Sequence, residues 1–166
     1  MNIGIIGSGT MGIGIAHATA QKQHKTLVYD SSPSSLEHGK EKLYILLEKL
    51  VEKGKYSVEQ SNNIKKNIIF SENLNDIKNS ELVIEAIVEN LKIKKEVFTK
   101  TESLVSADCI IASNTSSLSI ASIASACKKS ERVIGMHFFN PANLIPLVEI
   151  IPAIQTSKET INKTKS

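Results

Sequence analysis

The sequence contains no tryptophan, and aromatic residues make up only 4% of its 166 residues. A basic groove with interleaved aromatic side chains is therefore missing, so we expect no nucleic-acid partner. No apolar run approaches the roughly 20 residues of a membrane helix, and no basic segment precedes the first apolar stretch as in a signal peptide. These absences predict a cytoplasmic protein without a membrane partner.

Cysteine is also scarce. Cys109 and Cys127 lie far apart without a C-x-x-C spacing, which favours free thiols over a disulfide. The sequence has no Cys/His cluster of the kind that binds zinc, and no G-x-S-x-G elbow of a serine hydrolase. We expect neither a metal site nor a serine nucleophile.

The remaining composition is that of one globular α/β domain. Hydrophobic residues make up 41% and charged residues 22% of the chain, which is enough for a packed core. The net charge of +3 is small, and its lysines are scattered as on a solvated surface.

Strand-like and helix-like segments alternate along the chain, as in a parallel sheet covered by helices on both faces. The expected parallel strands are residues 2–6, 26–30, 67–70, 81–87, 109–113 and 132–137. A last strand at 147–151 follows a loop too short for a crossover helix, so it should run antiparallel at an edge. The pattern predicts a Rossmann-like, doubly wound, mainly parallel sheet with an antiparallel edge strand.

An amphipathic insertion follows the second strand. Leucines recur there at spacings of three, four and seven, and Ser57 after Gly54 is a candidate N-cap for a further helix. This pattern predicts a helical hairpin inserted between the second and third strands. Another helix is expected to begin near Ser157.

The first strand runs directly into G-x-G-x-x-G, formed by Gly7, Gly9 and Gly12. In a dinucleotide-binding turn, the first glycine permits the tight turn and the second lets the backbone approach a pyrophosphate. The third lets the following helix pack closely on the sheet, and that helix offers its N-terminus to the phosphates. The predicted phosphate-binding residues are Gly7, Ser8, Gly9, Thr10, Met11 and Gly12.

Asp30 ends the second strand and points to the choice of cofactor. A carboxylate there accepts hydrogen bonds from the ribose hydroxyls of an adenosine and repels a 2′-phosphate. The next residues, Ser31 and Ser32, supply no arginine to hold that phosphate. The sequence therefore favours NAD over NADP.

Two polar segments leave later strands at the same edge of the sheet. After the fourth strand, Glu89 and Lys94 could contact the ribose on the nicotinamide side. After the fifth strand, the segment with Asn114 and Ser116 could place a hydroxyl beside the nicotinamide. Each segment could also serve only as a solvated loop or a helix cap.

The strand at 132–137 ends in His137, and the antiparallel return can bring Glu149 beside it. A carboxylate against imidazole fixes its tautomer and stabilises the imidazolium, as a base that accepts an alcohol proton requires. His17, His24 and His38 lack such a context and are interpreted as structural.

Four motifs together, GSGTMGIGIA, EAIVENLKIK, SNTSSL and HFFNP…LVEI, resemble the NAD-binding domain of the 3-hydroxyacyl-CoA dehydrogenases from residue 1 to about 151. This resemblance implies an NAD-dependent oxidoreductase of fatty-acid metabolism that interconverts (S)-3-hydroxyacyl-CoA and 3-oxoacyl-CoA. It implies His137 as general base and acid and Glu149 as its orienting partner.

The resemblance also implies roles for residues around this pair. Ser116 would bond the 3-oxygen of the substrate, and Asn140 would support the loop. Asn114, Glu89 and Lys94 would bind the cofactor. Lys53 resembles a lysine that contacts the CoA moiety.

Members of this family continue into a helical C-terminal domain. We therefore expect an NAD-binding domain at 1–152 and the start of a truncated helical domain, or a tail, at 153–166. The helical domain could be supplied in trans or by dimerisation, and the chain alone could be inactive. The open alternatives are a gulonate- or carnitine-type hydroxy-acid dehydrogenase and a non-catalytic NAD-binding module.

Overall fold

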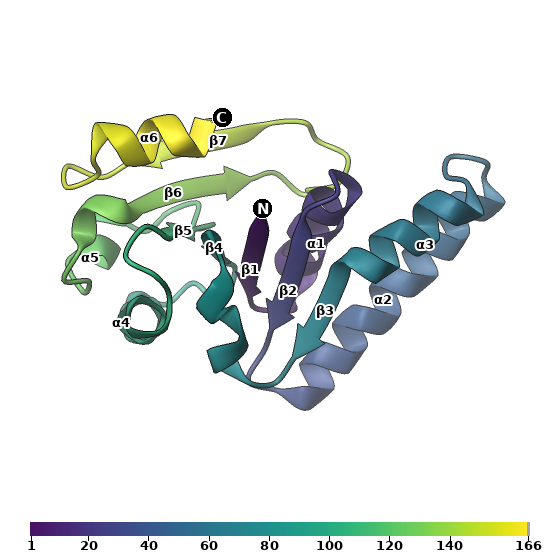
Figure 1. Ribbon diagram of the computed structural model, residues 1–166, viewed down its shortest axis with the longest axis horizontal. Coiled ribbons are helices and arrows are strands. Elements are labelled where there is room, and N and C mark those ends of the chain that lie inside the picture. Colours follow the sequence, from purple (N-terminus) through teal and green to yellow (C-terminus); the bar gives the residue numbers. More distant parts are fainter. Residues whose placement is uncertain (166) are drawn as a thin grey trace.

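The computed structural model describes residues 1–165, and these form a seven-stranded sheet with helices on both faces (Figure 1). The strands are β1 (Asn2–Ile6), β2 (Lys25–Tyr29), β3 (Ile68–Ser71), β4 (Leu82–Glu85), β5 (Ile110–Ser113), β6 (Val133–Phe138) and β7 (Val148–Pro152). The α-helices are α1 (Thr10–Gln21), α2 (Pro33–Glu52), α3 (Val58–Asn67), α4 (Leu91–Leu104), α5 (Ile120–Ala124) and α6 (Lys158–Lys165). Two short 3-10 helices are η1 (Leu74–Asn79) and η2 (Ser130–Arg132).

The strand order is β3-β2-β1-β4-β5-β6-β7, and it reverses direction between β1 and β4. Strands β1 to β6 are parallel, whereas β7 pairs with β6 in the antiparallel sense. This confirms the predicted doubly wound sheet and its antiparallel edge. The strand expected at 81–87 ends at Glu85, because the Ile87 N–H turns back to donate to the Glu85 carboxylate rather than to a neighbouring strand.

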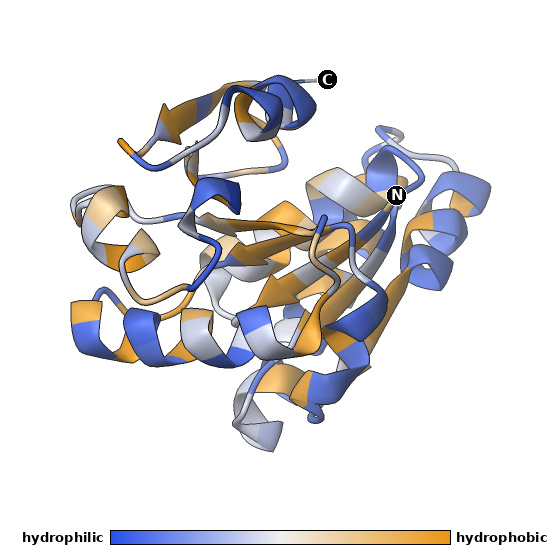
Figure 2. Cartoon of the chain, turned by 60° about the vertical axis from the view of Figure 1, so that its left-hand side comes forward, coloured by the Kyte–Doolittle hydropathy of each residue, from blue (hydrophilic) through white to orange (hydrophobic). Residues whose placement is uncertain are grey.

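Buried strand residues alternate between two hydrophobic clusters, one on each face of the sheet. Ile5 and Ile84 pack in the cluster beneath α1, α2 and α3, whereas Val83 and Ile111 pack in the cluster beneath α4 and α5. The central strands are accordingly among the most apolar parts of the chain (Figure 2). Within residues 1–165, no helix combines the length and apolar character that a membrane span requires.

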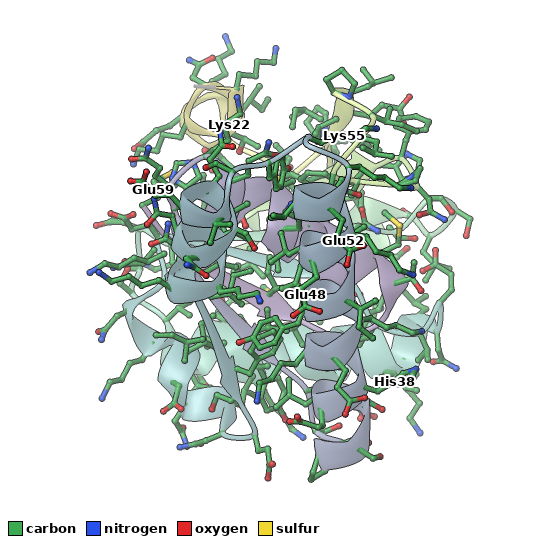
Figure 3. All side chains as sticks on the ribbon, turned by 90° about the vertical axis from the view of Figure 1, so that its right-hand side faces the viewer. Lys22, His38, Glu48, Glu52, Lys55 and Glu59 are labelled. Atoms are coloured by element: carbon green, nitrogen blue, oxygen red, sulfur yellow. The ribbon has the colours of Figure 1, made fainter. Side chains whose placement is uncertain are left out.

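The predicted helical hairpin is confirmed as α2 and α3, which lie together at one side of the molecule (Figure 1). Ser57 caps α3 in a reciprocal capping box with Gln60. The outward surface of the hairpin carries charged side chains such as Glu48 and Glu59 (Figure 3). Its inward surface buries Leu36, Leu43 and Leu47.

The expected C-terminal helix is present as α6. Ser157 precedes it, and its Oγ accepts a hydrogen bond from the Thr160 N–H at 3.1 Å. Thr160 is itself buried, and its hydroxyl donates to the Glu131 carbonyl at 2.9 Å. The helix therefore packs against the sheet domain, and the division of the chain at residue 152 stays a prediction.

Two of the three glycines in the turn, Gly7 and Gly12, lie where no side chain fits. Gly7 has φ +107°, and a Cβ on it would lie 2.6 Å from the Ala86 carbonyl oxygen. A Cβ on Gly12 would lie 1.9 Å from the Gly7 carbonyl oxygen, so α1 approaches the turn as closely as the motif predicts. A Cβ on Gly9, in contrast, would meet no atom within 4 Å.

The same substitution, glycine to alanine, is therefore expected to affect stability differently at Gly12 and at Gly9. Gly12→Ala should lower the free energy of unfolding by about 1–3 kcal/mol, because the added Cβ strikes backbone that cannot move cheaply. Gly9→Ala should keep the stability of the wild type, because its φ of −66° suits alanine and the space is open. Denaturant unfolding of both variants measures the difference, and equal midpoints would contradict this account.

Candidate functional site

A cleft of about 1090 Å³ borders the carboxyl ends of the first strands. Its walls include the glycine turn at residues 7–10, Asp30 after β2, the inner side of α2 and the loop at residues 140–144. The strand order reverses at β1 and β4, beside this cleft. Open α/β sheets bind their ligands at this kind of position.

The N-terminus of α1 opens into the cleft. Gly9 is its N-cap, and no side chain forms a capping hydrogen bond there. The first N–H groups of a helix lack intrahelical partners and carry a partial positive charge. With open space in front of Gly9, the turn fits a phosphate group that approaches the backbone directly.

Helix α2 comes close to the same turn through Gly39. A Cβ on Gly39 would lie 2.7 Å from the Ser8 carbonyl oxygen. The neighbouring His38 and Lys42 therefore lie in the cleft wall, and Figure 3 labels His38 toward the N-terminal end of α2. His38 was interpreted from the sequence as a structural residue, but the structure places it in the wall of the cleft. A glycine inside an amphipathic helix was the available signal of this close packing.

The Asp30 carboxylate is tied to the glycine turn. Its Oδ2 accepts hydrogen bonds from the Ser8 N–H and hydroxyl, each at 2.8 Å, and its Oδ1 accepts from the Ser32 N–H at 3.0 Å. These bonds fix the carboxylate at the cleft wall. A carboxylate oxygen has two lone pairs, so Oδ1 can accept a further hydrogen bond from a ribose hydroxyl.

The expected pairing of His137 and Glu149 is present. The two residues are directly opposite each other in the β6–β7 ladder, and His137 Nδ1 lies 2.8 Å from Glu149 Oε2. Because a carboxylate only accepts, this contact places the proton of a neutral imidazole on Nδ1 and leaves Nε2 as an acceptor. The His137 side chain is 20% exposed, and its ring packs against Phe139. The pair has the arrangement of an oriented general base.

The loop after β5 is fastened on both sides of Ser116. Thr115 and Ser117 each donate a hydroxyl hydrogen bond to Glu89 Oε1. Asn114 Oδ1 accepts a hydrogen bond from the Phe138 N–H at 2.9 Å, which joins this loop to the end of β6. Ser116 itself is exposed. The structure therefore holds the loop through the residues on either side of Ser116 and leaves Ser116 itself exposed to solvent.

Glu89 and Lys94 belong to a partly buried charge network. Lys94 Nζ lies 2.5 Å from Glu85 Oε1 and 3.2 Å from Glu89 Oε2, and the Lys94 side chain is 1% exposed. Partial burial raises the pKa of Glu89, but hydrogen bonds from Thr115 and the Lys94 charge outweigh it and hold that pKa below its usual range. Glu85 is not among the residues predicted from the sequence, although a carboxylate that ends an apolar strand is a usable signal.

The predicted site residues form two groups. Residues 7–10, Asp30 and Asn140 line the cleft. Glu89 and Ser116 follow β4 and β5, whereas His137 lies in β6 and Glu149 opposite it in β7. A hydrogen bond between Asn114 and Phe138 connects the ends of β5 and β6. Met11 packs against the hydrophobic core instead.

Lys53 lies at the other end of α2 from the cleft. It is the C-cap residue of that helix, seven residues after Leu46, the last residue of α2 that lines the cleft, which corresponds to about 10 Å along the helix axis. The structure therefore does not bring Lys53 together with the other predicted residues, and its contact with a CoA group stays a prediction.

The cysteines and His17 lie in packing positions. Cys109 and Cys127 are buried free thiols, as expected, and burial raises the pKa of each to about 11. His17 is buried with Nε2 3.2 Å from the Tyr56 hydroxyl, and burial lowers its pKa. Among residues 1–165, no three His, Cys, Asp or Glu side chains gather as metal ligands would.

Comparison with known proteins matches residues 2–166 to the family described as "3-hydroxyacyl-CoA dehydrogenase, NAD binding domain". A 3-hydroxybutyryl-CoA dehydrogenase of Clostridioides difficile is 41% identical over 162 residues, covering 98% of this chain and 58% of that protein. The solved structure of (S)-3-hydroxybutyryl-CoA dehydrogenase from Ralstonia eutropha superimposes with a TM-score of 0.96 at 36% identity, covering 99% of this chain and 58% of that one. The structure of 3-hydroxybutyryl-CoA dehydrogenase from Escherichia coli K12 gives a TM-score of 0.96 at 36% identity, covering 98% and 34%.

The chain thus spans about 58% of the length of the curated relative from Clostridioides difficile. The family match, in contrast, extends over nearly all of this chain. Together with the glycine turn and the doubly wound sheet, it shows that this chain belongs to the NAD-binding domain family of the 3-hydroxyacyl-CoA dehydrogenases, whose cofactor is NAD.

Proposed function

We propose that this chain is the NAD-binding half of an enzyme that interconverts (S)-3-hydroxyacyl-CoA and 3-oxoacyl-CoA. The observation that supports this most is the His137–Glu149 pair, a 2.8 Å contact at the same edge of the sheet as the glycine turn. A dinucleotide-binding turn alone suits many dehydrogenases. The oriented base beside it suits one that removes a hydroxyl proton.

The cleft fits NAD on its adenosine side. Gly9 leaves open space before the N-terminus of α1, as a pyrophosphate requires, and Asp30 offers an acceptor for ribose hydroxyls. The proposed phosphate contacts come from residues 7–12, and Asn114, Glu89 and Lys94 are proposed for the other half of the cofactor. When bound, NAD supplies the acceptor for the hydride that an alcohol loses on oxidation.

His137 is proposed as the proton-transferring group. Nδ1 donates to Glu149, so Nε2 accepts the hydroxyl proton of the substrate in oxidation and returns it in reduction. The Glu149 carboxylate keeps the ring oriented and stabilises the imidazolium that forms. The neighbouring Phe139 ring restricts the imidazole further.

Further residues would position the substrate. The exposed Ser116 hydroxyl would donate a hydrogen bond to the 3-oxygen, and Asn140 would support the loop that forms the cleft wall. Lys53 would contact the CoA group. The acyl group would be enclosed by a helical domain beyond the proposed domain at 1–152. A cytoplasmic location is part of the same proposal.

NAD affinity tests the cofactor half of this proposal. Gly9→Ala should weaken NAD binding about tenfold or more, because the added methyl group fills the space that a phosphate would occupy. Isothermal titration with NAD measures the change. Because this variant is expected to keep its stability, loss of affinity with an unchanged melting temperature supports a phosphate site, and unchanged affinity argues against one.

Asp30 predicts a preference between the two nicotinamide dinucleotides. The wild-type chain should bind NAD about tenfold or more tightly than NADP, because the carboxylate repels a 2′-phosphate. Titration of the same preparation with each dinucleotide at matched ionic strength measures the ratio. Equal affinities would remove Asp30 from the proposed ribose site.

Catalysis is tested in this chain joined to the part of the Ralstonia eutropha relative that the chain does not match. NADH formation from (S)-3-hydroxybutyryl-CoA should fall about 10²–10⁴-fold in His137→Gln, because the variant lacks the base, while NAD affinity stays unchanged. His24→Gln is the matched control and should retain full activity. Preferential oxidation of gulonate or carnitine would redirect the proposal to those dehydrogenases, and NAD binding without turnover of any of these substrates would indicate a non-catalytic module.

A further inference from the structure

The tip of the α2–α3 hairpin consists of residues 53–57, and Figure 3 labels Lys55 there. Its backbone turns back on α2, because the N–H groups of Lys55 and Tyr56 both donate to the Leu50 carbonyl. Among residues 52–60, Tyr56 is the only one that is not exposed. The tip therefore meets the rest of the protein mainly through this side chain.

The Tyr56 side chain contacts the middle of α1. Its hydroxyl oxygen lies 3.2 Å from His17 Nε2, and the two rings meet edge to face with centroids 5.9 Å apart. The Gln21 side chain, about one turn further along α1, also hydrogen-bonds the hydroxyl. A tyrosine hydroxyl can donate one hydrogen bond and accept another, so His17 and Gln21 can hold it together.

His17 is an unfavourable residue to bury for packing alone. Its side chain is fully buried, and Nδ1 has no hydrogen-bond partner among residues 1–165. Burial lowers its pKa and keeps the imidazole neutral at neutral pH, but the unpaired ring nitrogen still lowers stability. An apolar side chain of similar size would fill the same space without this cost. Stability therefore does not explain the imidazole, whereas its contact with Tyr56 does.

This contact joins two segments that face different parts of the proposed ligands. Helix α1 begins at Thr10 in the glycine turn, and His17 follows seven residues later. The tip carries Lys53, which is exposed and is proposed to contact the CoA group. Because Leu46 is the last residue of α2 in the cleft wall, the place of Lys53 relative to the cleft depends on how the tip is held.

We propose that the His17–Tyr56 contact sets the position of the hairpin tip relative to α1, and thereby positions Lys53 for the nucleotide end of an acyl-CoA. This inference rests on the proposed function. Both are positioning residues, since neither His17 nor Tyr56 lines the cleft formed by the described residues. The inference gives a role to His17, which the sequence alone indicates only as a structural histidine.

A purely structural role for the contact is the competing explanation. If the contact only stabilises the packing of the hairpin, its removal affects both ligands alike or neither. A positioning role predicts a selective loss of acyl-CoA binding, because the glycine turn and Asp30 do not depend on the hairpin tip for their hydrogen bonds. Two ligands measured in the same variant therefore separate the explanations.

The experiment measures the dissociation constants of acetoacetyl-CoA and NADH for this chain, together with hydrogen exchange of residues 52–60. The double variant His17→Leu/Tyr56→Phe removes both polar partners, so neither is left unpaired by loss of the other. We expect exchange at the tip to become about tenfold faster and acetoacetyl-CoA binding to weaken about fivefold or more. NADH binding should change less than about twofold.

Tyr44→Phe is the matched control. It removes a hydroxyl from the same hairpin but leaves the ring that Lys65 covers, and it should match the wild type in exchange and in both affinities. Tyr56→Phe alone is the second variant, because it keeps the aromatic ring and deletes only the hydroxyl. It should show the same selective loss if the double variant does not fold.

The inference and the proposed function fail in different ways. Unchanged exchange at the tip, parallel weakening of both ligands, or no change in either affinity in a folded variant overturns the positioning role. Failure of the wild-type chain to bind NADH overturns the proposed function itself, and failure to bind acetoacetyl-CoA overturns its CoA part, in each case with the inference.

Discussion

Close backbone contact around the glycine turn is the constraint on which the site depends. The Cβ positions of Gly7, Gly12 and Gly39 would lie 2.6, 1.9 and 2.7 Å from backbone oxygens of neighbouring segments. Through these contacts, the loop after β4, helix α1 and helix α2 all meet the same turn. The glycine turn and the α2 wall of the cleft are therefore positioned by close main-chain contact, and side chains of α4 such as Ile93 and Val97 complete the lining.

Much of this arrangement could be predicted because its signals are local. Alternating apolar segments indicate the strand sequence, the spacing of Gly7, Gly9 and Gly12 indicates the turn, and a short loop indicates an antiparallel β7. The pairing of His137 with Glu149 followed from the same topology. Each of these depends on residues that are near in sequence or on the standard handedness of parallel sheets.

The burial of Lys94 could not be predicted in the same way. In the sequence, Lys94 stands beside other lysines at the start of α4, and this pattern indicates a solvated side chain. Only the approach of Glu85 from β4 makes burial of Lys94 favourable. His38 shows the complementary case, since its place in the cleft wall follows from Gly39 docking on Ser8. Both outcomes depend on which side chains meet across segments distant in sequence, and hydrophobic periodicity does not encode that information.

The β6–β7 ladder has a consequence for how such a domain can change during evolution. His137 and Glu149 meet because they are directly opposite in an antiparallel pair, and the connecting segment at residues 139–147 does not determine their separation. Exposed positions of that segment, such as Leu144, can therefore exchange residues while the ladder keeps its register, whereas Phe139 packs on His137 and Ala142 is buried in the core. Since residues 140–144 line the cleft, selectivity can diverge on a loop whose ends are anchored, while the proposed proton-transfer pair keeps its place in the ladder.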